Sequence, residues 1–377
     1  MCSPMAFRLA LATFLLLSVF SRLGAQTLDT PSSGAHFTDV ADSLGPYFTA
    51  RAYHTTTKYL LETMGSGVAT FEYDNDGLLD VLLLNGAPLN ASIPHGAIPQ
   101  KRTPADWNRL YHQKKDGTFE DVTEKSGLQG VGYGMGVAVG DYDKDGFEDV
   151  YVTAYGGNRL YHNTGKGTFV DVTQRSGTGG ETQVGQGWST SAAWVDLDND
   201  GKLDLVVLRY VKWDFDDTWC GEHREGYRAY CHPNIFPAIR PLVYRNNGDG
   251  TFTECADKFG LFAPGKGLGI AVADFNLDGR IDLAIASDSM PQFLYRNKCG
   301  YAYRLDRSSH AQLGRAPRGP GGSVRARQPL ARCEERLTDT VKLYDPHRSS
   351  ARVWCALRSS SGCPQILRVS TCRKPGT

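Results

Sequence analysis

Four short acidic loops with one shared pattern constrain this chain more than any other feature of its sequence. Each loop has a carboxylate or amide side chain at positions 1, 3, 5 and 9 and a glycine at position 6. The loops span residues 72–80, 141–149, 196–204 and 274–282. A pattern that recurs along a chain is typical of a repeat array and not of a domain with one undivided core. We therefore expect a repeat protein.

Each loop is predicted to be a calcium cage. Calcium binds six to eight oxygens from carboxylates, amides, backbone carbonyls and water. The side chains at positions 1, 3, 5 and 9 and the carbonyl at position 7 would supply them, and the glycine permits a sharp turn with positive φ. The predicted ligands are Glu72, Asp74, Asp76, Leu78, Asp80, Asp141, Asp143, Asp145, Phe147, Asp149, Asp196, Asp198, Asp200, Lys202, Asp204, Asp274, Asn276, Asp278, Arg280 and Asp282. The alternative is an Asp-Gly hairpin turn on an acidic surface. Without a cation, however, such crowded carboxylates would repel one another.

The residues around each loop predict strands. An EF-hand would continue to a glutamate at position 12, between helices, but here position 12 is Leu83, Val152, Val207 or Ile285. A glycine-rich or small-residue strand precedes each loop, and apolar, largely β-branched runs follow it. Third strands are expected at 109–112, 159–162, 242–246 and 293–297, and fourth strands at 117–123, 167–173 and 250–254. Four short strands per unit indicate an all-β propeller with about four blades. Residues 36–40 repeat the fourth-strand pattern and are expected to close the ring.

The repeat resembles the FG-GAP (VCBS) family, whose fold is similar to the integrin alpha-subunit propeller. It is most similar to the extracellular group related to cartilage acidic protein, which often carries an ASPIC/UnbV domain. Residues 58–67, 107–111, 132–136 and 291–295 carry this resemblance. It implies a seven-bladed propeller with calcium loops on one face, in proteins that act as adhesion or matrix modules and not as enzymes. Residues 26–297 would then form an incomplete propeller with four calcium loops.

The repeat pattern stops at Asn297, and the charge balance changes there. Residues 26–297 hold 23 Lys and Arg against 36 Asp and Glu, whereas residues 298–377 hold 16 against 5. We favour a shifted reading frame as the origin of an aberrant, disordered tail over residues 298–377. The alternative is a genuine basic tail that binds nucleic acid, heparin-like polymers or anionic lipid.

The N-terminus and the cysteines indicate export. Residues 1–25 resemble a signal peptide, with an apolar run too short to span a membrane. The chain is therefore expected to be secreted, whether extracellular, periplasmic or at the cell surface. Cys220 and Cys231 are predicted to form a disulfide that clips a long insertion. A zinc site that adds His223 and His232 is the alternative.

The expected function is that of a non-enzymatic, secreted, monomeric calcium-binding module for an extracellular protein or glycan, and not for nucleic acid. The insertion at residues 212–241 is the expected ligand surface, because amphipathic aromatic side chains anchor interfaces and sugar rings. Its members are Trp213, Trp219, Tyr227, Tyr230 and His232. These aromatic residues can equally pack the loop onto the propeller. The rival class is a polysaccharide lyase or hydrolase, with His54, His112, His162, Arg159 and Arg209 as acid, base or charge-stabilising candidates.

Overall fold

A computed structural model describes residues 36–304, apart from residues 46, 91, 181–186, 217, 225, 299 and 300. The predicted signal peptide and nearly all of the predicted tail lie outside these described residues. The chain divides into two units, Met1–Asp42 and Ser43–Thr377. All four sheets belong to the second unit.

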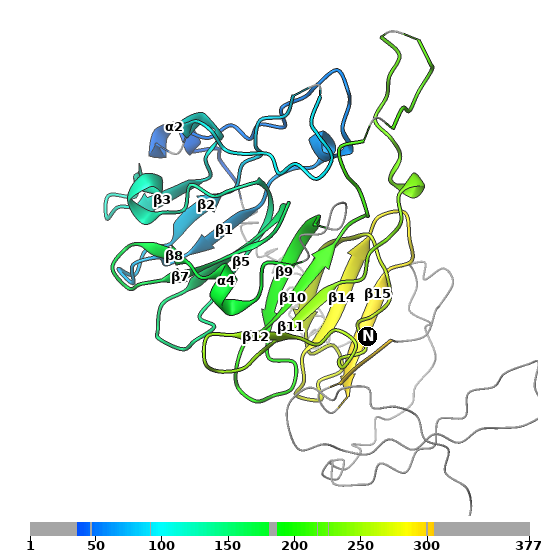
Figure 1. The fold of residues 1–377 in the computed structure, drawn as a ribbon. Helices are drawn as coiled ribbons and strands as arrows, with labels where there is room; N and C mark the ends of the chain where they lie inside the picture. Colours follow the sequence, from blue (N-terminus) through cyan, green and yellow to red (C-terminus); the bar gives the residue numbers. More distant parts are fainter. Residues whose placement is uncertain are drawn as a thin grey trace, which may run out of the picture. The chain divides into compact units, whose positions relative to one another are not determined.

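The fold is all-β, as predicted, and consists of four antiparallel four-stranded sheets that follow one another along the chain (Figure 1). Sheet 1 contains β1 (Val68–Phe71), β2 (Asp80–Leu83), β3 (Arg109–Gln113) and β4 (Phe119–Asp121). Sheet 2 contains β5 (Tyr133–Gly140), β6 (Asp149–Tyr155), β7 (Arg159–Asn163) and β8 (Phe169–Asp171). Sheet 3 contains β9 (Ser189–Val195), β10 (Asp204–Arg209), β11 (Leu242–Asn246) and β12 (Phe252–Glu254). Sheet 4 contains β13 (Gly267–Ala273), β14 (Asp282–Ser287), β15 (Phe293–Lys298) and β16 (Tyr301–Arg304).

Short helical turns lie before the first strand and between later strands. The α-helical turns are α2 (Ala41–Leu44), α3 (Thr123–Ser126) and α4 (Thr173–Ser176), and the 3₁₀ turns are η1 (Leu60–Thr63), η2 (Pro104–Asp106) and η3 (Pro233–Ile235). No helix within the described part of the chain is long and apolar enough to cross a membrane.

Each sheet has two apolar faces, because side chains alternate along a strand. We call the face turned toward the next sheet along the chain the forward face and the opposite one the rear face. In sheet 2 the register places Ala138, Tyr151 and Leu160 in one row, on the forward face. Val139, Val150 and Tyr161 form a row on the rear face. Burial on both faces explains why these strands are almost continuously apolar.

Three hydrophobic clusters fill the spaces between successive sheets. The forward face of sheet 1 packs against the rear face of sheet 2 through Phe71, Leu82, Leu110, Val150 and Val152 among others. Equivalent clusters join sheets 2 and 3, and sheets 3 and 4. Full burial of one Leu or Val side chain contributes about 1.5–3 kcal/mol. The clusters therefore hold together sheets that are too small to be stable alone.

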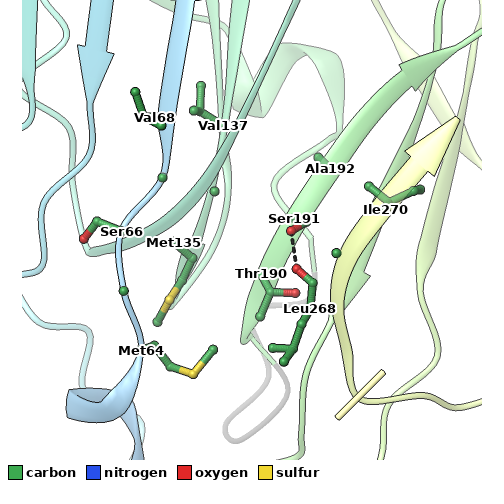
Figure 2. A pocket seen from close by; sticks show the side chains of 14 residues that line it. Met64, Ser66, Val68, Met135, Val137, Thr190, Ser191, Ala192, Leu268 and Ile270 are labelled. Carbon is green, nitrogen blue, oxygen red and sulfur yellow. Dashed lines mark hydrogen bonds between the residues drawn. The ribbon is translucent and has the colours of Figure 1, made fainter. Parts of the chain in front are cut away.

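Glycine and small residues let the first strands of the sheets lie close together. A Cβ atom on Gly136 would lie 2.3 Å from the carbonyl oxygen of Thr190. Across the next pair of strands, Ser191 Oγ donates a hydrogen bond to the carbonyl of Leu268 at 2.5 Å. Figure 2 shows these strands around a cavity of about 490 Å³, which Met64 and Met135 also line. The predicted small-residue strands therefore lie where neighbouring sheets approach each other closely.

Two boundaries differ from those expected. Sheet 4 continues past residue 297, because β16 pairs with β15 over four residue pairs, from Tyr295–Arg304 to Lys298–Tyr301. Residues 36–40, the expected closing strand, form no strand, and Phe37 is 97% exposed. A fourth-strand sequence pattern thus does not by itself produce a strand where the adjacent strand is not in place.

Candidate metal centres

Each acidic loop connects the first and second strands of one sheet, as predicted. The second strands start at Asp80, Asp149, Asp204 and Asp282, which are the position-9 residues. All four sit at the strand end next to their own loop, and each is at most 1% exposed. The repeat therefore places one carboxylate of every loop inside the protein.

The loop backbone takes two left-handed residues, of which the sequence pattern revealed only one. The glycines at position 6 have φ between 82° and 90°. The residues at position 4, Asn75, Lys144, Asn199 and Leu277, also have φ between 55° and 63°. Asparagine tolerates this conformation well, whereas a branched apolar residue does not. Leu277 is 90% exposed and is the most strained member of this set.

The position-1 carboxylate organises the loop. Asp141 Oδ1 accepts the backbone N–H of Asp145 at 3.1 Å, and its Oδ2 accepts that of Gly146 at 3.0 Å. The corresponding aspartates of the third and fourth loops accept the same two N–H groups. Glu72 accepts the N–H of Gly77. Position 1 therefore shapes the turn as well as offering oxygens to a cation.

The position-9 aspartate ties the loop to the third strand. Asp149 Oδ2 accepts the N–H of Tyr142 at 3.2 Å, and its Oδ1 accepts that of Asn163 at 2.9 Å. Asp80, Asp204 and Asp282 make the same pair of bonds. Burial raises the pKa of Asp149 to about 7, and the nearby Asp143 carboxylate also raises it. Burial likewise raises the pKa of Asp204 to about 6. Burial thus disfavours the ionised form of both carboxylates.

Three of the four loops bring carboxylates together at metal-binding distances. Ligand atoms of Asp141, Asp143 and Asp149 lie within 4.8 Å of one another, as do those of Asp196, Asp198 and Asp204. In the first loop, Asp74 and Asp80 cluster with His112 in the same way. Among the described residues the fourth loop forms no such group, and Asn276 Nδ2 instead donates to Asp278 Oδ2 at 3.0 Å.

Two buried oxygens indicate that a cation fits these clusters. Asp74 Oδ1 and Asp198 Oδ1, both at position 3, are buried and have no hydrogen-bond partner. A buried carboxylate oxygen without a partner is costly. A hard divalent cation would satisfy these atoms, because carboxylate oxygens are its preferred ligands.

A basic residue on the third strand lies beside three of the loops, and sequence reasoning did not assign it there. His112 Nδ1 lies 3.0 Å from Asp80 Oδ1, and His162 Nδ1 lies 3.1 Å from Asp149 Oδ1. In the third loop, Arg245 Nε donates to Asp198 Oδ2 at 2.7 Å and Nη2 donates to Asp200 Oδ2 at 2.8 Å. The recurring pair of Tyr followed by His or Arg in each third strand was the available signal.

The residues of the expected ligand surface lie in different environments in the structure. Trp213 is 5% exposed and packs in a buried aromatic cluster with Tyr59, Tyr155 and Phe215, so it contributes to the core and not to a surface. Tyr230 is half-buried, and its hydroxyl donates to the buried Glu62 at 2.9 Å. His232 is exposed and caps η3 by accepting the N–H of Asn234.

The remaining aromatic side chains lie on a clipped hairpin. A disulfide joins Cys220 to Cys231, so neither sulfur is available as a zinc ligand. Within this hairpin Trp219 stacks on His223, and the Arg228 guanidinium lies 4.9 Å from the Trp219 ring centroid. Tyr227 is 50% exposed beneath the Arg224 guanidinium.

Comparison with known proteins agrees with this repeat. The FG-GAP-like repeat family matches residues 72–152, 141–207 and 240–285, and the first two matches begin at an acidic loop. Human cartilage acidic protein 1 is 27% identical over 198 residues, which is 52% of this chain and 27% of the human protein. The mouse protein is 27% identical over 199 residues, covering 52% of this chain and 28% of the mouse protein. The alignment thus spans only about a quarter of these relatives' length.

One solved structure to which the chain is similar is that of a lectin from Agrocybe aegerita that recognises non-reducing terminal N-acetylglucosamine. The match covers 63% of this chain and 52% of the lectin, with 17% sequence identity and a TM-score of 0.32. A TM-score this low supports no conclusion about the ligand. The family match and the four-stranded sheets both identify the repeat. The chain is built from FG-GAP-like repeats and is a distant homologue of cartilage acidic protein 1 over half of its length.

Proposed function

We propose that this chain is a secreted, calcium-stabilised module that binds another extracellular macromolecule without catalysing a reaction. The observation that carries the calcium assignment is the pair of buried, unpartnered oxygens on Asp74 and Asp198. Asp74 lies in a cluster with Asp80 and His112, and Asp198 lies in a cluster with Asp196 and Asp204. The residues that would hold calcium are those at positions 1, 3, 5, 7 and 9 of each loop.

Calcium would balance the negative charge of these clusters, which in the third loop Arg245 already offsets in part. The loop residues themselves do the structural part: position 1 shapes the turn, and position 9 ties the loop to the third strand. A cation shared by positions 1, 3 and 9 would therefore cross-link the hairpin and the third strand of one sheet. Near-millimolar extracellular calcium suits sites of low affinity. Export is further supported by the disulfide, because such bonds persist in oxidising compartments.

The binding role is supported by the clipped hairpin. Its exposed Tyr227 and half-buried Trp219 alternate with arginine guanidinium groups. Arginine and large aromatic side chains dominate the energetics of many interfaces. Because the disulfide restricts the hairpin, less conformational entropy is lost on binding.

Two of the three histidines proposed as catalysts have structural partners in the acidic loops. His112 and His162 each contact the position-9 aspartate of their own sheet. Arg159 pairs with Asp171, and Arg209 is buried with Nε bonded to the carbonyl of Arg240. This arrangement supports a binding module over a lyase or hydrolase.

Incubation of the protein with alginate and with pectin in the presence of calcium tests this choice, because depolymerisation of either polymer would contradict a non-enzymatic role.

The calcium assignment is tested by thermal unfolding of the protein in EDTA and in millimolar calcium or magnesium. Free calcium at 100 times the dissociation constant of one site stabilises the folded state by about 2.7 kcal/mol. We therefore expect calcium to raise the midpoint by about 5–10 °C or more. Asp198→Asn should reduce that increase, whereas Asp257→Asn, at an exposed aspartate outside the loops, should not. An unfolding midpoint that does not respond to calcium would refute the assignment.

A further inference from the structure

The third strand of every sheet carries a basic residue directly after a tyrosine, and the type of this residue differs between the repeats. The strand register aligns the four tyrosines, because each pairs with the residue that follows position 9 of its own loop. The basic residue is His112 in sheet 1 and His162 in sheet 2, but Arg245 in sheet 3 and Arg296 in sheet 4. An imidazole nitrogen can bind a metal ion, whereas a guanidinium group has only donors. The four loops therefore fall into two chemical kinds.

The imidazole of His112 lies among three carboxylates of the first loop. Its Nδ1 is 3.0 Å from Asp80 Oδ1 and 3.8 Å from Asp74 Oδ2, and its Nε2 is 4.0 Å from Asp76 Oδ2. The side chain is only 19% exposed, and the ring of Tyr73 packs edge-on against it with 5.4 Å between ring centroids. The ring is thus held with Nδ1 toward two carboxylates of its loop.

The second loop repeats this arrangement with a different surrounding sequence. His162 Nδ1 is 3.1 Å from Asp149 Oδ1 and 3.3 Å from Asp143 Oδ2, and its Nε2 is 3.9 Å from Asp145 Oδ2. Tyr142 again packs edge-on against the imidazole, with 6.4 Å between ring centroids. The same nitrogen therefore faces the carboxylates of positions 3 and 9 in both loops.

The spacing of these donor atoms suits a small transition metal ion. Zinc holds nitrogen and carboxylate oxygen at about 2.0–2.2 Å in tetrahedral sites, so two of its ligand atoms lie about 3.3–3.6 Å apart. The separations of Nδ1 from the position-3 and position-9 carboxylates, 3.0–3.8 Å in the two loops, bracket that range. In the first loop the buried Asp74 Oδ1 has no hydrogen-bond partner and offers a further oxygen. Imidazole is a preferred ligand of zinc, whereas calcium prefers oxygen alone.

The third loop provides the internal contrast. Its Asp196, Asp198 and Asp204 cluster as closely as the carboxylates of the second loop. Beside them, however, Arg245 donates from Nε to Asp198 Oδ2 at 2.7 Å and has no nitrogen lone pair to offer. The cluster thus keeps the oxygen ligands of a hard cation and lacks the nitrogen ligand.

We propose that loops one and two are sites for a transition metal ion such as zinc, bound through Nδ1 of His112 or His162 and the carboxylates of positions 3 and 9. Loop three, by contrast, accepts only a hard cation such as calcium. This inference rests on the proposed function, because zinc would occupy loops that are proposed to hold calcium. It adds that the third-strand residue sets which ion each loop prefers.

Titration calorimetry of the metal-free full chain with zinc chloride, and separately with calcium chloride, tests the proposal. We expect His112→Asn and His162→Asn each to weaken zinc binding at one site by about tenfold or more and to leave calcium binding in place. His95→Asn is the matched control, because His95 Nδ1 lies 3.2 Å from a single carboxylate, that of Asp214, outside the loops. All other histidines and the cysteines are the same in every protein, so their zinc binding cancels in the difference.

A gain of binding complements these losses. Arg245→His places an imidazole beside the third loop and should add one zinc site, which keeps the proposal testable even if a histidine variant fails to fold. Histidines that only offset the carboxylate charge would predict unchanged or tighter zinc binding in the Asn variants. That result, or an Arg245→His variant that gains no zinc site, overturns the inference while calcium binding still stands. A wild type that binds zinc at these loops but not calcium would instead refute the calcium assignment alone.

Discussion

At the scale of single residues, the four loops share a backbone but differ in the charge beside them. Loops one and two have a histidine near their carboxylates, whereas loop three has the permanently charged Arg245. Arginine stays protonated at any relevant pH. The third loop therefore carries its own counter-charge, which a calcium ion would have to share or displace.

Replacing Arg245 should make the third loop depend more strongly on calcium. Removal of a unit charge near a carboxylate pair changes the electrostatic energy by about 1–4 kcal/mol. We expect Arg245→Met to lower stability in EDTA and to tighten calcium binding by about tenfold, as measured by titration calorimetry. Arg240→Met is the control, since Arg240 pairs with Glu254 away from the loops. Equal calcium affinity in both variants would contradict the role of Arg245.

The pKa of Asp149 predicts how the calcium-free protein responds to pH. Because burial raises this pKa from 3.8 to about 7, the folded state binds more protons than the unfolded state between these values. The stability contribution is therefore full below pH 3.8 and is lost as pH rises through about 7. In EDTA, denaturant unfolding should show greater stability at pH 6 than at pH 8, and Asp149→Asn should flatten that difference. Saturating calcium should also reduce it, because the bound ion favours the ionised carboxylate.

At the scale of elements, the third strand joins neighbouring sheets as well as its own. Asn246 is 1% exposed and donates to the carbonyls of Tyr142, in loop two, and Leu203, in its own loop. A buried polar group that loses its partner costs about 1–3 kcal/mol. Asn246→Ala should therefore lower the free energy of unfolding by about that amount. Asn247→Ala removes an exposed amide next to it and should cost less than about 0.5 kcal/mol, with both values taken from denaturant titrations.

The periodicity of these elements determines how much of them could be predicted from the sequence. The strands around each loop were predictable, because the acidic pattern fixes the register and the β-branched runs fix the type. The left-handed conformation at position 4 was not, because Lys144 and Leu277 do not favour it and only the closed loop imposes it. For Trp213 the sequence left a ligand surface and packing onto the sheets equally open, because an aromatic side chain in a long insertion has no periodicity to reveal its burial; the structure shows that it is buried. The role of Arg245 depends on a contact across 45 residues, so the recurring Tyr-His or Tyr-Arg pair marks the position but not its partner.

At the scale of the whole molecule, the asparagine contacts between sheets have a consequence for cooperativity. Each joins a third strand to the loop of the preceding sheet, and the position-9 aspartate joins that loop to its own third strand. Together these bonds couple every unit to its nearest neighbours, and the aromatic contacts of Tyr59 with Trp213 and Phe215 add a link between the residues before sheet 1 and the insertion of sheet 3. Unfolding of such an array is expected to begin by fraying at its ends and to advance unit by unit, as in a zipper. An ion lost from an inner loop would weaken the units on both sides, whereas one lost from a terminal loop would weaken a single neighbour.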